Sequence, residues 1–145
     1  MPYSKVYLHA VWSTKNRIPF LNTHSLRQTV WDHISDNAIK KEIYIDTING
    51  YEEHCHCLFA LNVNATISKT LQLIKGESSF WINQQELCKS RFEWQEEYFV
   101  VSVSPSMLGR VRLYINNQEE HHKKQTFRDE YDAMIKKFGL RNMEE

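Results

Sequence analysis

The chain has 145 residues, 41% of them hydrophobic and 12% aromatic, which suits one compact domain over residues 1–145. Its 18 basic and 18 acidic residues give a formal net charge of zero, so a uniformly basic protein is excluded and any nucleic-acid surface must be local. No apolar run approaches the roughly 18 residues of a membrane span, and no signal-peptide pattern is present. We therefore expect a cytoplasmic protein with no membrane partner.

Strand-like and helix-like segments alternate along the chain. Tyr3 to Trp12 is rich in β-branched and aromatic residues and predicts the first strand. Apolar residues at helical spacing then predict a helix over 24–40, capped by Asn22 or Thr23. The residues 42–49 and 51–61 predict two more strands.

Asn49 and Gly50 separate these two strands and are the strongest short turn signal in the sequence. We expect them to join the strands as an antiparallel hairpin. Beyond it, Thr66 is a predicted cap for a helix that runs to about residue 87, and residues 92–104 are β-prone.

Two helices are predicted at the end of the chain. Ser106 is the expected cap of one that runs to about residue 120, and Thr126 caps another over 127–138, which Gly139 ends. The first six elements then match the split βαβ, ferredoxin-like arrangement. We expect an α+β fold in which a four-stranded antiparallel sheet carries helices on one face, plus a C-terminal tyrosine-bearing helix.

His54 and His56 lie one residue apart within the third predicted strand. Successive side chains of a strand point to opposite faces, so the two imidazoles share one face, roughly 6.5–7 Å apart along the chain. Cys55 and Cys57 share the other face, where core packing is the expected role. We expect the histidine pair to form half of a metal site. With Cys88 the chain has three cysteines, and this odd number argues against a disulfide framework.

The third predicted helix supplies the missing half. Tyr114 and Gln118 are four residues apart and so lie on one helix face. The Gln118 carbonyl oxygen can complete a set with His54 and His56 that suits Mg²⁺ or Mn²⁺ bound to a phosphate substrate. A metal ion that polarises a DNA phosphate would allow Tyr114 to attack it and form a phosphotyrosine link, with a free hydroxyl on the other DNA end.

These residues and several other blocks resemble the single-tyrosine HUH transposases, the IS200/IS605-like family. His54-Cys55-His56 resembles its histidine–hydrophobe–histidine motif, and Tyr114-Ile115-Asn116-Asn117-Gln118 resembles its tyrosine helix. Stretches at 11–17, 73–79, 94–98, 101–104, 118–127 and 130–131 agree in type and order. The family usually has an aspartate before the first histidine and aliphatic residues around the second, whereas this chain has Glu53, Cys55 and Cys57 there.

The resemblance implies a metal ion held by His54, His56 and Gln118, and Tyr114 as the nucleophile that forms a 5′-phosphotyrosine on single-stranded DNA. It implies recognition of a DNA hairpin and a homodimer, because in this family the tyrosine helix often completes the active site of the partner subunit. His121 and His122 could be further ligands, but a solvated basic surface that touches DNA is the preferred interpretation. Candidate phosphate contacts, each equally readable as an exposed solvated cation, are Lys15, Arg17, Lys69, Lys75, Arg110, Arg112, Lys123 and Lys124.

Three other functions stay open at the level of sequence. A domesticated relative would act on chromosomal palindromes with the same chemistry. A ferredoxin-like module would bind DNA without cutting it, and a zinc-structural protein would use the histidines and cysteines for folding alone.

Overall fold

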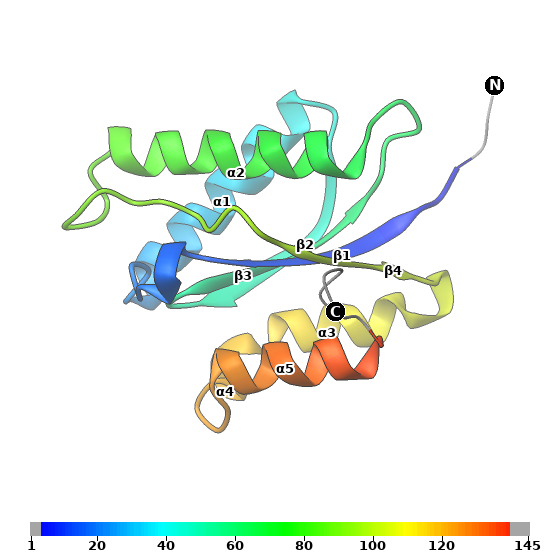
Figure 1. Cartoon of the computed structure of the whole chain (residues 1–145). Coiled ribbons are helices and arrows are strands. Elements are labelled where there is room, and N and C mark those ends of the chain that lie inside the picture. Colours follow the sequence, from blue (N-terminus) through cyan, green and yellow to red (C-terminus); the bar gives the residue numbers. More distant parts are fainter. Residues whose placement is uncertain (1–3, 140–145) are drawn as a thin grey trace.

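A four-stranded antiparallel sheet forms the centre of the computed structural model, which describes residues 4–139 (Figure 1). Its strands pair in the order β2-β3-β1-β4. They are β1 (Tyr7–Ser13), β2 (Tyr44–Tyr51), β3 (His54–Ala60) and β4 (Phe99–Val103). Two long helices, α1 (His24–Lys40) and α2 (Ile67–Gln84), provide the crossovers and lie on one face of the sheet (Figure 1). The predicted α+β, ferredoxin-like fold is confirmed.

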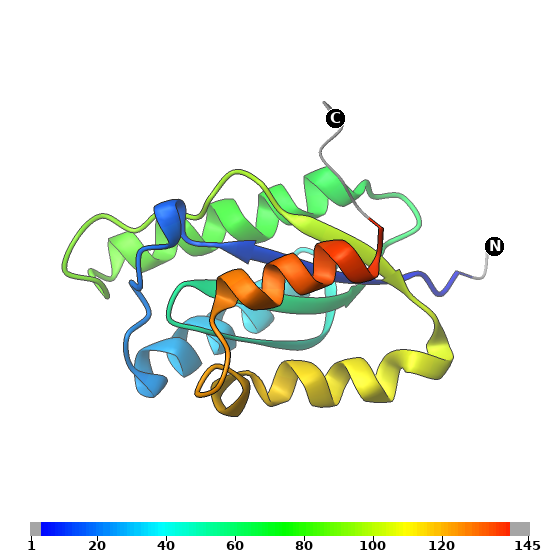
Figure 2. The same ribbon diagram turned by 60° about the horizontal axis from the view of Figure 1, so that its bottom comes forward.

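The C-terminal helices cover the opposite face of the sheet (Figures 1 and 2). They are α3 (Leu108–Asn116), the single turn α4 (Gln118–His121) and α5 (Phe127–Lys137), and the short 3₁₀ segments are η1 (Lys15–Arg17) and η2 (Pro105–Met107). Figure 2 shows α3 and α5 lying across the sheet on this face. Residues of β1 and β3 that point this way are therefore enclosed between sheet and helices. No helix in the described part of the chain has the length and apolar character needed to cross a membrane.

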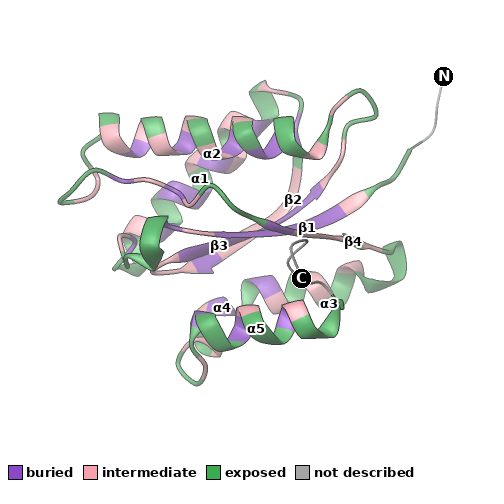
Figure 3. Cartoon of the chain, in the orientation of Figure 1, coloured by how far each residue is buried: buried purple, intermediate pink, exposed green. Residues whose placement is uncertain are grey.

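Strand alternation divides the interior into two apolar clusters. Figure 3 shows that buried residues lie along the central strands and on the helix sides that face them. The larger cluster lies between the sheet and α1 and α2. It takes one face of β1 and β3, namely Leu8, Ala10, Trp12, Cys55, Cys57 and Phe59. Both hairpin cysteines are completely buried in it, which confirms the expected packing role.

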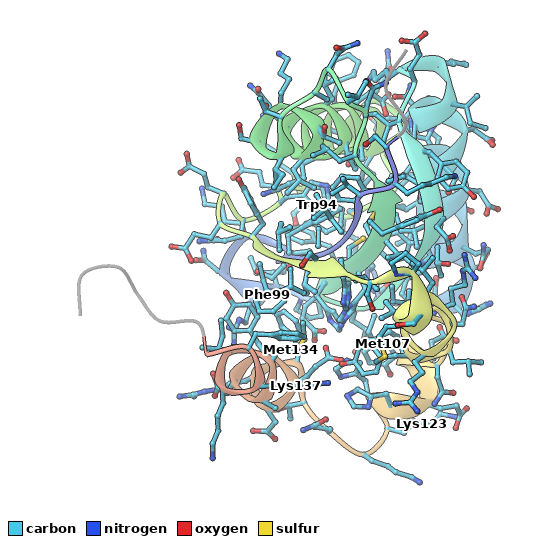
Figure 4. The ribbon with its side chains drawn as sticks, turned by 90° about the vertical axis from the view of Figure 1, so that its right-hand side faces the viewer. Trp94, Phe99, Met107, Lys123, Met134 and Lys137 are labelled. Carbon is cyan, nitrogen blue, oxygen red and sulfur yellow. The ribbon has the colours of Figure 1, made fainter. Side chains whose placement is uncertain are left out.

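The smaller cluster attaches α5 to the other face of the sheet. It consists of Val11, Phe99, Phe127 and Met134. Figure 4 shows Phe99 of β4 and Met134 of α5 between sheet and helix. The docking of α5 thus depends on a few apolar contacts between segments that are far apart in the sequence.

Three helices begin at the residues that the capping pattern predicts. Thr23, Thr66 and Thr126 each accept a hydrogen bond from the backbone N–H three residues later, at 3.1 Å. Gly139 has a φ of 65° just after α5, which is the left-handed position of a helix-ending glycine.

The predicted turn at Asn49 and Gly50 is wrong in its position. The hairpin exists, but β2 continues through both residues and the turn lies at Glu52 and Glu53. Gly50 is required for a different reason, because a Cβ atom there would collide with the carbonyl oxygen of His54. The glycine allows β2 and β3 to approach closely beside the histidine pair.

Asn49 also has a structural role other than turning the chain. Its Nδ2 atom donates to the carbonyl oxygens of Ile115 at 3.0 Å and Asn116 at 3.3 Å. These are among the last carbonyls of α3, which have no partner within the helix. The contact ties the tyrosine-bearing helix to the strand next to β3.

Three other predicted elements are shorter than expected. The first strand begins at Tyr7 instead of Tyr3, and Tyr3 lies outside the described residues. β4 covers only Phe99–Val103, because Phe92 and Trp94 are buried against the larger cluster instead of joining the ladder, apart from one isolated bridge between Trp94 and Thr14. The third helix is interrupted at Asn117, and Ser106 lies in η2 without capping it.

Candidate metal centre and active site

β3 places the predicted histidine pair on the sheet face that the C-terminal helices cover. His54 and His56 are both completely buried. The cross-strand neighbours of His56 are Val11 and Asn49, which also contact α5 and α3 on the same face of the sheet. The two imidazoles therefore point into the region where sheet, α3, α4 and α5 meet.

Five side chains converge there: His54, His56, Gln118, His122 and Glu130. The Nε2 atoms of His54 and His122 lie 2.9 Å and 3.0 Å from Gln118 Oε1. Glu130 Oε1 lies 3.1 Å, 3.2 Å and 3.4 Å from the Nε2 atoms of His56, His122 and His54. Neighbouring ligands of an octahedral ion with bonds near 2.1 Å are about 3 Å apart, so this spacing fits a metal ion.

The other ring nitrogen of each histidine has a partner of its own. His54 Nδ1–H donates to Glu53 Oε1 at 2.7 Å, and His122 Nδ1–H donates to the carbonyl oxygen of Gln125 at 2.8 Å. His56 Nδ1 shares a hydrogen bond of 2.9 Å with His9 Nε2. Metal-binding histidines are oriented in this way, because the outer contact turns the free Nε2 atom toward the centre.

Burial and neighbouring charge set the protonation of the cluster. Burial raises the pKa of Glu130, but hydrogen bonds from His122, His54 and His56 outweigh it and hold that pKa far below its ordinary value. Burial lowers the pKa of His56 from 6.5 to about 4 and that of His9 to about 3. Glu130 is therefore an anion at neutral pH, and His9 and His56 are neutral imidazoles.

Tyr114 lies beside this cluster at the end of α3. Its hydroxyl donates a hydrogen bond to Glu130 Oε2, and its ring meets that of His56 edge-on, with 5.5 Å between centroids. Gln118 Nε2 donates to the same carboxylate oxygen at 3.0 Å. Burial and the adjacent carboxylate raise the pKa of Tyr114 well above its usual range, so the phenol is protonated in this arrangement.

The Tyr114 side chain lines a cleft between α3 and α5 with a volume of about 430 Å³. His9, His121 and Glu130 lie on the same wall region, and Arg110 and Lys137 also line the cleft. His121 Nε2 lies 3.3 Å from Glu130 Oε2 and has no hydrogen-bond partner among the described residues. The cleft thus contains the Tyr114 phenol together with the cationic side chains of Arg110 and Lys137, which suit an anionic ligand.

Comparison with known proteins identifies the family. A family model described as "Transposase IS200 like" matches residues 2–118. The chain belongs to the IS200-like transposase family. Among curated proteins, none matches the chain.

Two solved structures share the fold of this IS200-like transposase. One is a candidate transposase from Deinococcus radiodurans R1, with 21% identity, a TM-score of 0.65, and coverage of 81% of this chain and 93% of that one. The other is a REP-associated tyrosine transposase bound to a REP hairpin, with 16% identity, a TM-score of 0.58, and coverage of 88% of this chain and 73% of that one.

The structure brings together the four residues predicted for metal binding and catalysis in this IS200-like transposase and adds His122, Glu130 and His9. For His122, ligation is the alternative interpretation and the preferred one, a solvated cation, is wrong, because its side chain is buried in the cluster. The sequence analysis assigns no site role to Glu130 or His9. A signal existed for His122 alone, since Tyr114, Gln118 and His122 follow one another at intervals of four residues.

The eight predicted phosphate contacts fall into different environments. Lys15, Arg112 and Lys123 pair with Glu93, Asp46 and Glu120 at 3.0 Å, 2.7 Å and 2.8 Å. Lys75 Nζ donates to the carbonyl oxygens of Gln95 and Glu96 and so fixes the segment before β4. Lys69 is on α2, across the sheet from the cluster, and Lys124 lies in the turn after α4. Arg110 and Arg17 line hollows next to the cluster.

Proposed function

We propose that this transposase cuts and rejoins single-stranded DNA at hairpin-marked ends, with Tyr114 as nucleophile and a divalent cation in the histidine cluster. The observation that carries the proposal is the contact of the Tyr114 hydroxyl with Glu130, whose other oxygen faces three imidazole Nε2 atoms. A protonated phenol is thereby held at the edge of a set of metal-ligand atoms.

The residues that would hold the cation are His54, His56, His122, Gln118 and Glu130. Ligand atoms of His54, His122 and Glu130 all lie within 4.8 Å of one another. The bound ion would neutralise negative charge on the scissile phosphate. Of the two ions expected from the sequence, Mg²⁺ and Mn²⁺, the imidazole-rich set favours Mn²⁺, because Mg²⁺ prefers oxygen ligands and retained waters.

Tyr114 and Glu130 perform the covalent step in this proposal. The phenolic oxygen attacks phosphorus and forms a new P–O bond, while the bond from phosphorus to the 3′ oxygen of the preceding nucleotide breaks. The hydrogen bond to Glu130 Oε2 orients the phenol, whose proton leaves to solvent as the P–O bond forms, and the departing 3′ oxygen takes up a proton from solvent to become a hydroxyl. The 5′-phosphotyrosine keeps the phosphodiester's energy, so a later 3′ hydroxyl can reverse the step without ATP.

A gel assay tests the proposal. Labelled single-stranded hairpin DNA is incubated with the protein and Mn²⁺ or Mg²⁺ and separated under denaturing conditions. We expect a covalent protein–DNA adduct that is lost with a chelator and in Tyr114→Phe, but kept in Tyr44→Phe, which removes an exposed hydroxyl on β2. An adduct that persists in Tyr114→Phe would contradict the assigned nucleophile.

Three outcomes would favour the other functions. DNA binding without any adduct, across cognate hairpin ends, would support a non-catalytic module. One tightly bound zinc per chain that is retained in His54→Ala would support a structural metal protein. A domesticated relative would give the adduct but select chromosomal palindromes over element ends.

A homodimer with a shared active site stays a prediction from the family resemblance. In the single chain, Tyr114 of α3 already contacts Glu130 of the same chain. Mixing Tyr114→Phe with His54→Ala protein separates the two arrangements. Mixed dimers recover activity if Tyr114 acts on the partner's cluster, and stay inactive if each chain works alone.

A further inference from the structure

A second hollow lies next to the histidine cluster and has no part in the proposed covalent step. It has a volume of about 300 Å³ and opens between the end of β1, η1, the segment before β4 and α5. Its walls include the rings of Tyr98, Phe127 and Tyr131, the guanidinium of Arg17, and the amide side chains of Asn16 and Gln95. The volume is at the small end of the range for ligand pockets.

Phe127 is the wall that this hollow shares with the histidine cluster. Its ring stacks on the His54 imidazole, with 4.1 Å between centroids and 13° between planes. The Arg17 guanidinium lies 5.1 Å from the Phe127 centroid and 5.7 Å from that of Tyr131. Because His54 covers one face of Phe127, the guanidinium of Arg17 lies over the other face. Only the Phe127 ring therefore separates the hollow from His54, a candidate metal ligand.

The loop that carries Arg17 is held in an unfavourable backbone conformation. Asn16 and Arg17 have φ angles of 56° and 54°, in the left-handed region that side chains such as that of arginine rarely adopt. Bonds on both sides hold the loop, including Thr14 Oγ1 to the Ile18 carbonyl at 2.6 Å and the Asn16 N–H to Gln95 Oε1 at 3.4 Å. The planar group of Arg17 is therefore positioned before any ligand arrives.

We propose that this pocket binds one unpaired nucleobase of the DNA strand next to the cleaved phosphate; the inference rests on the proposed function. The Phe127 ring is covered on both faces, but the guanidinium of Arg17 and the rings of Tyr98 and Tyr131 offer flat surfaces on which a base stacks. Asn16, Gln95 and the Glu97 carboxylate, which also line the pocket, can hydrogen-bond a base edge. A phosphate would be repelled by Glu97, and a base inside a duplex has both faces already stacked.

Binding measurements with and without bases test the pocket. Fluorescence anisotropy compares a thymidylate oligomer with an abasic phosphodiester chain of equal length, in the presence of chelator so that no cleavage occurs. We expect the protein to prefer the thymidylate oligomer. Arg17→Ala and Tyr131→Leu should reduce that preference about 5- to 100-fold, which is the range for one stacked base.

Two further variants separate stacking from charge. Lys15→Ala removes an exposed cation from the same loop and should weaken both oligomers equally, because Lys15 does not line the pocket. Arg17→Lys keeps the charge but loses the planar face, so it should weaken the thymidylate oligomer more. Equal loss for both oligomers in Arg17→Ala, or no preference in the unmodified protein, would overturn the inference.

The adduct assay distinguishes this inference from the proposed function. If the adduct forms but the base preference does not depend on Arg17, only the pocket inference fails. If no adduct forms and the preference still depends on Arg17, the covalent mechanism fails and the base pocket stands.

Discussion

Glu130 connects the two halves of the candidate site at the scale of single residues. One oxygen accepts the Tyr114 hydroxyl, and the other faces the Nε2 atoms of three histidines. Its negative charge is what makes a buried cluster of imidazoles attractive to a cation. The same carboxylate thus fixes the phenol and supplies charge to the metal-ligand set.

The substitution Glu130→Gln should therefore weaken both functions of this residue. We expect Mn²⁺ affinity and the rate of adduct formation each to fall at least about tenfold, because the shape is kept and the charge is lost. Asp129→Asn is the matched control, since it removes one exposed charge from the same helix. Unchanged Mn²⁺ binding in Glu130→Gln, measured from the electron paramagnetic resonance signal of the free ion, would exclude it as a ligand.

We expect His9 to act as a positioning residue through its hydrogen bond with His56. Its neutral ring shares a hydrogen bond with His56 Nδ1, so we expect His9→Leu to lower Mn²⁺ affinity about 10- to 100-fold. His9→Gln, which can still hydrogen-bond, should restore part of the affinity. His33 lies on α1, on the opposite side of the sheet from the cluster, and pairs there with Glu77 of α2, so His33→Leu should leave the Mn²⁺ affinity unchanged. Equal losses in His9→Leu and His9→Gln would show that only packing matters.

At the scale of elements, the hairpin of β2 and β3 sets the position of the histidine pair. Gly50 allows the two backbones to approach, and Asn49 fastens the end of α3 to β2. The strand with the imidazoles and the helix with Tyr114 are therefore held to each other by consecutive residues of β2. A change in this hairpin should disturb both sides of the site.

Gly50→Ala and Gly76→Ala should have opposite effects on stability. At Gly50 the added methyl would press on the rigid backbone of His54, so we expect a loss of about 1–3 kcal/mol and impaired metal binding. At Gly76, in the exposed middle of α2, the methyl meets open space and should raise the free energy of unfolding by about 1 kcal/mol. Urea unfolding of the two variants checks both signs, and a stabilised Gly50→Ala would contradict this account of the hairpin.

At the scale of the whole molecule, the sheet separates an apolar core from the site. Burial raises the pKa of both Cys55 and Cys57, which lie on the core face of β3, whereas Cys88 is only half-buried. The reactivity of Cys55 and Cys57, compared with that of Cys88, should therefore show whether the core face of β3 is closed to solvent.

We expect one thiol per chain, Cys88, to react with a disulfide reagent in the native protein, and all three to react in denaturant. Cys88→Ser should then show no native reaction. Fast native labelling of Cys55 or Cys57 would mean that the core face opens, and Mn²⁺ binding that protects them would place them in the metal site instead.

Much of the fold could be predicted because its signals are local. Helix periodicity and the capping threonines placed α1, α2 and α5 closely. The turn prediction is wrong because Asn49 contacts α3 and Gly50 makes room for the backbone of His54. Both contacts involve residues outside the Asn-Gly pair, so the dipeptide alone does not predict them. The strand over 92–104 was too long because Phe92 and Trp94 are drawn into the core between sheet and helix.

Residues two and four positions apart predict the shared face of His54 and His56 and the pairing of Tyr114 with Gln118, and blocks spread along most of the chain indicate the family. The inclusion of Glu130, His122 and His9 in the cluster depends on tertiary packing. Glu130 lies beyond the stretch 2–118 that matches the family model, and it reaches the cluster because Phe127 and Met134 pack α5 against Val11 and Phe99. That docking depends on the burial of apolar surface between segments far apart in the chain, which local periodicity does not specify.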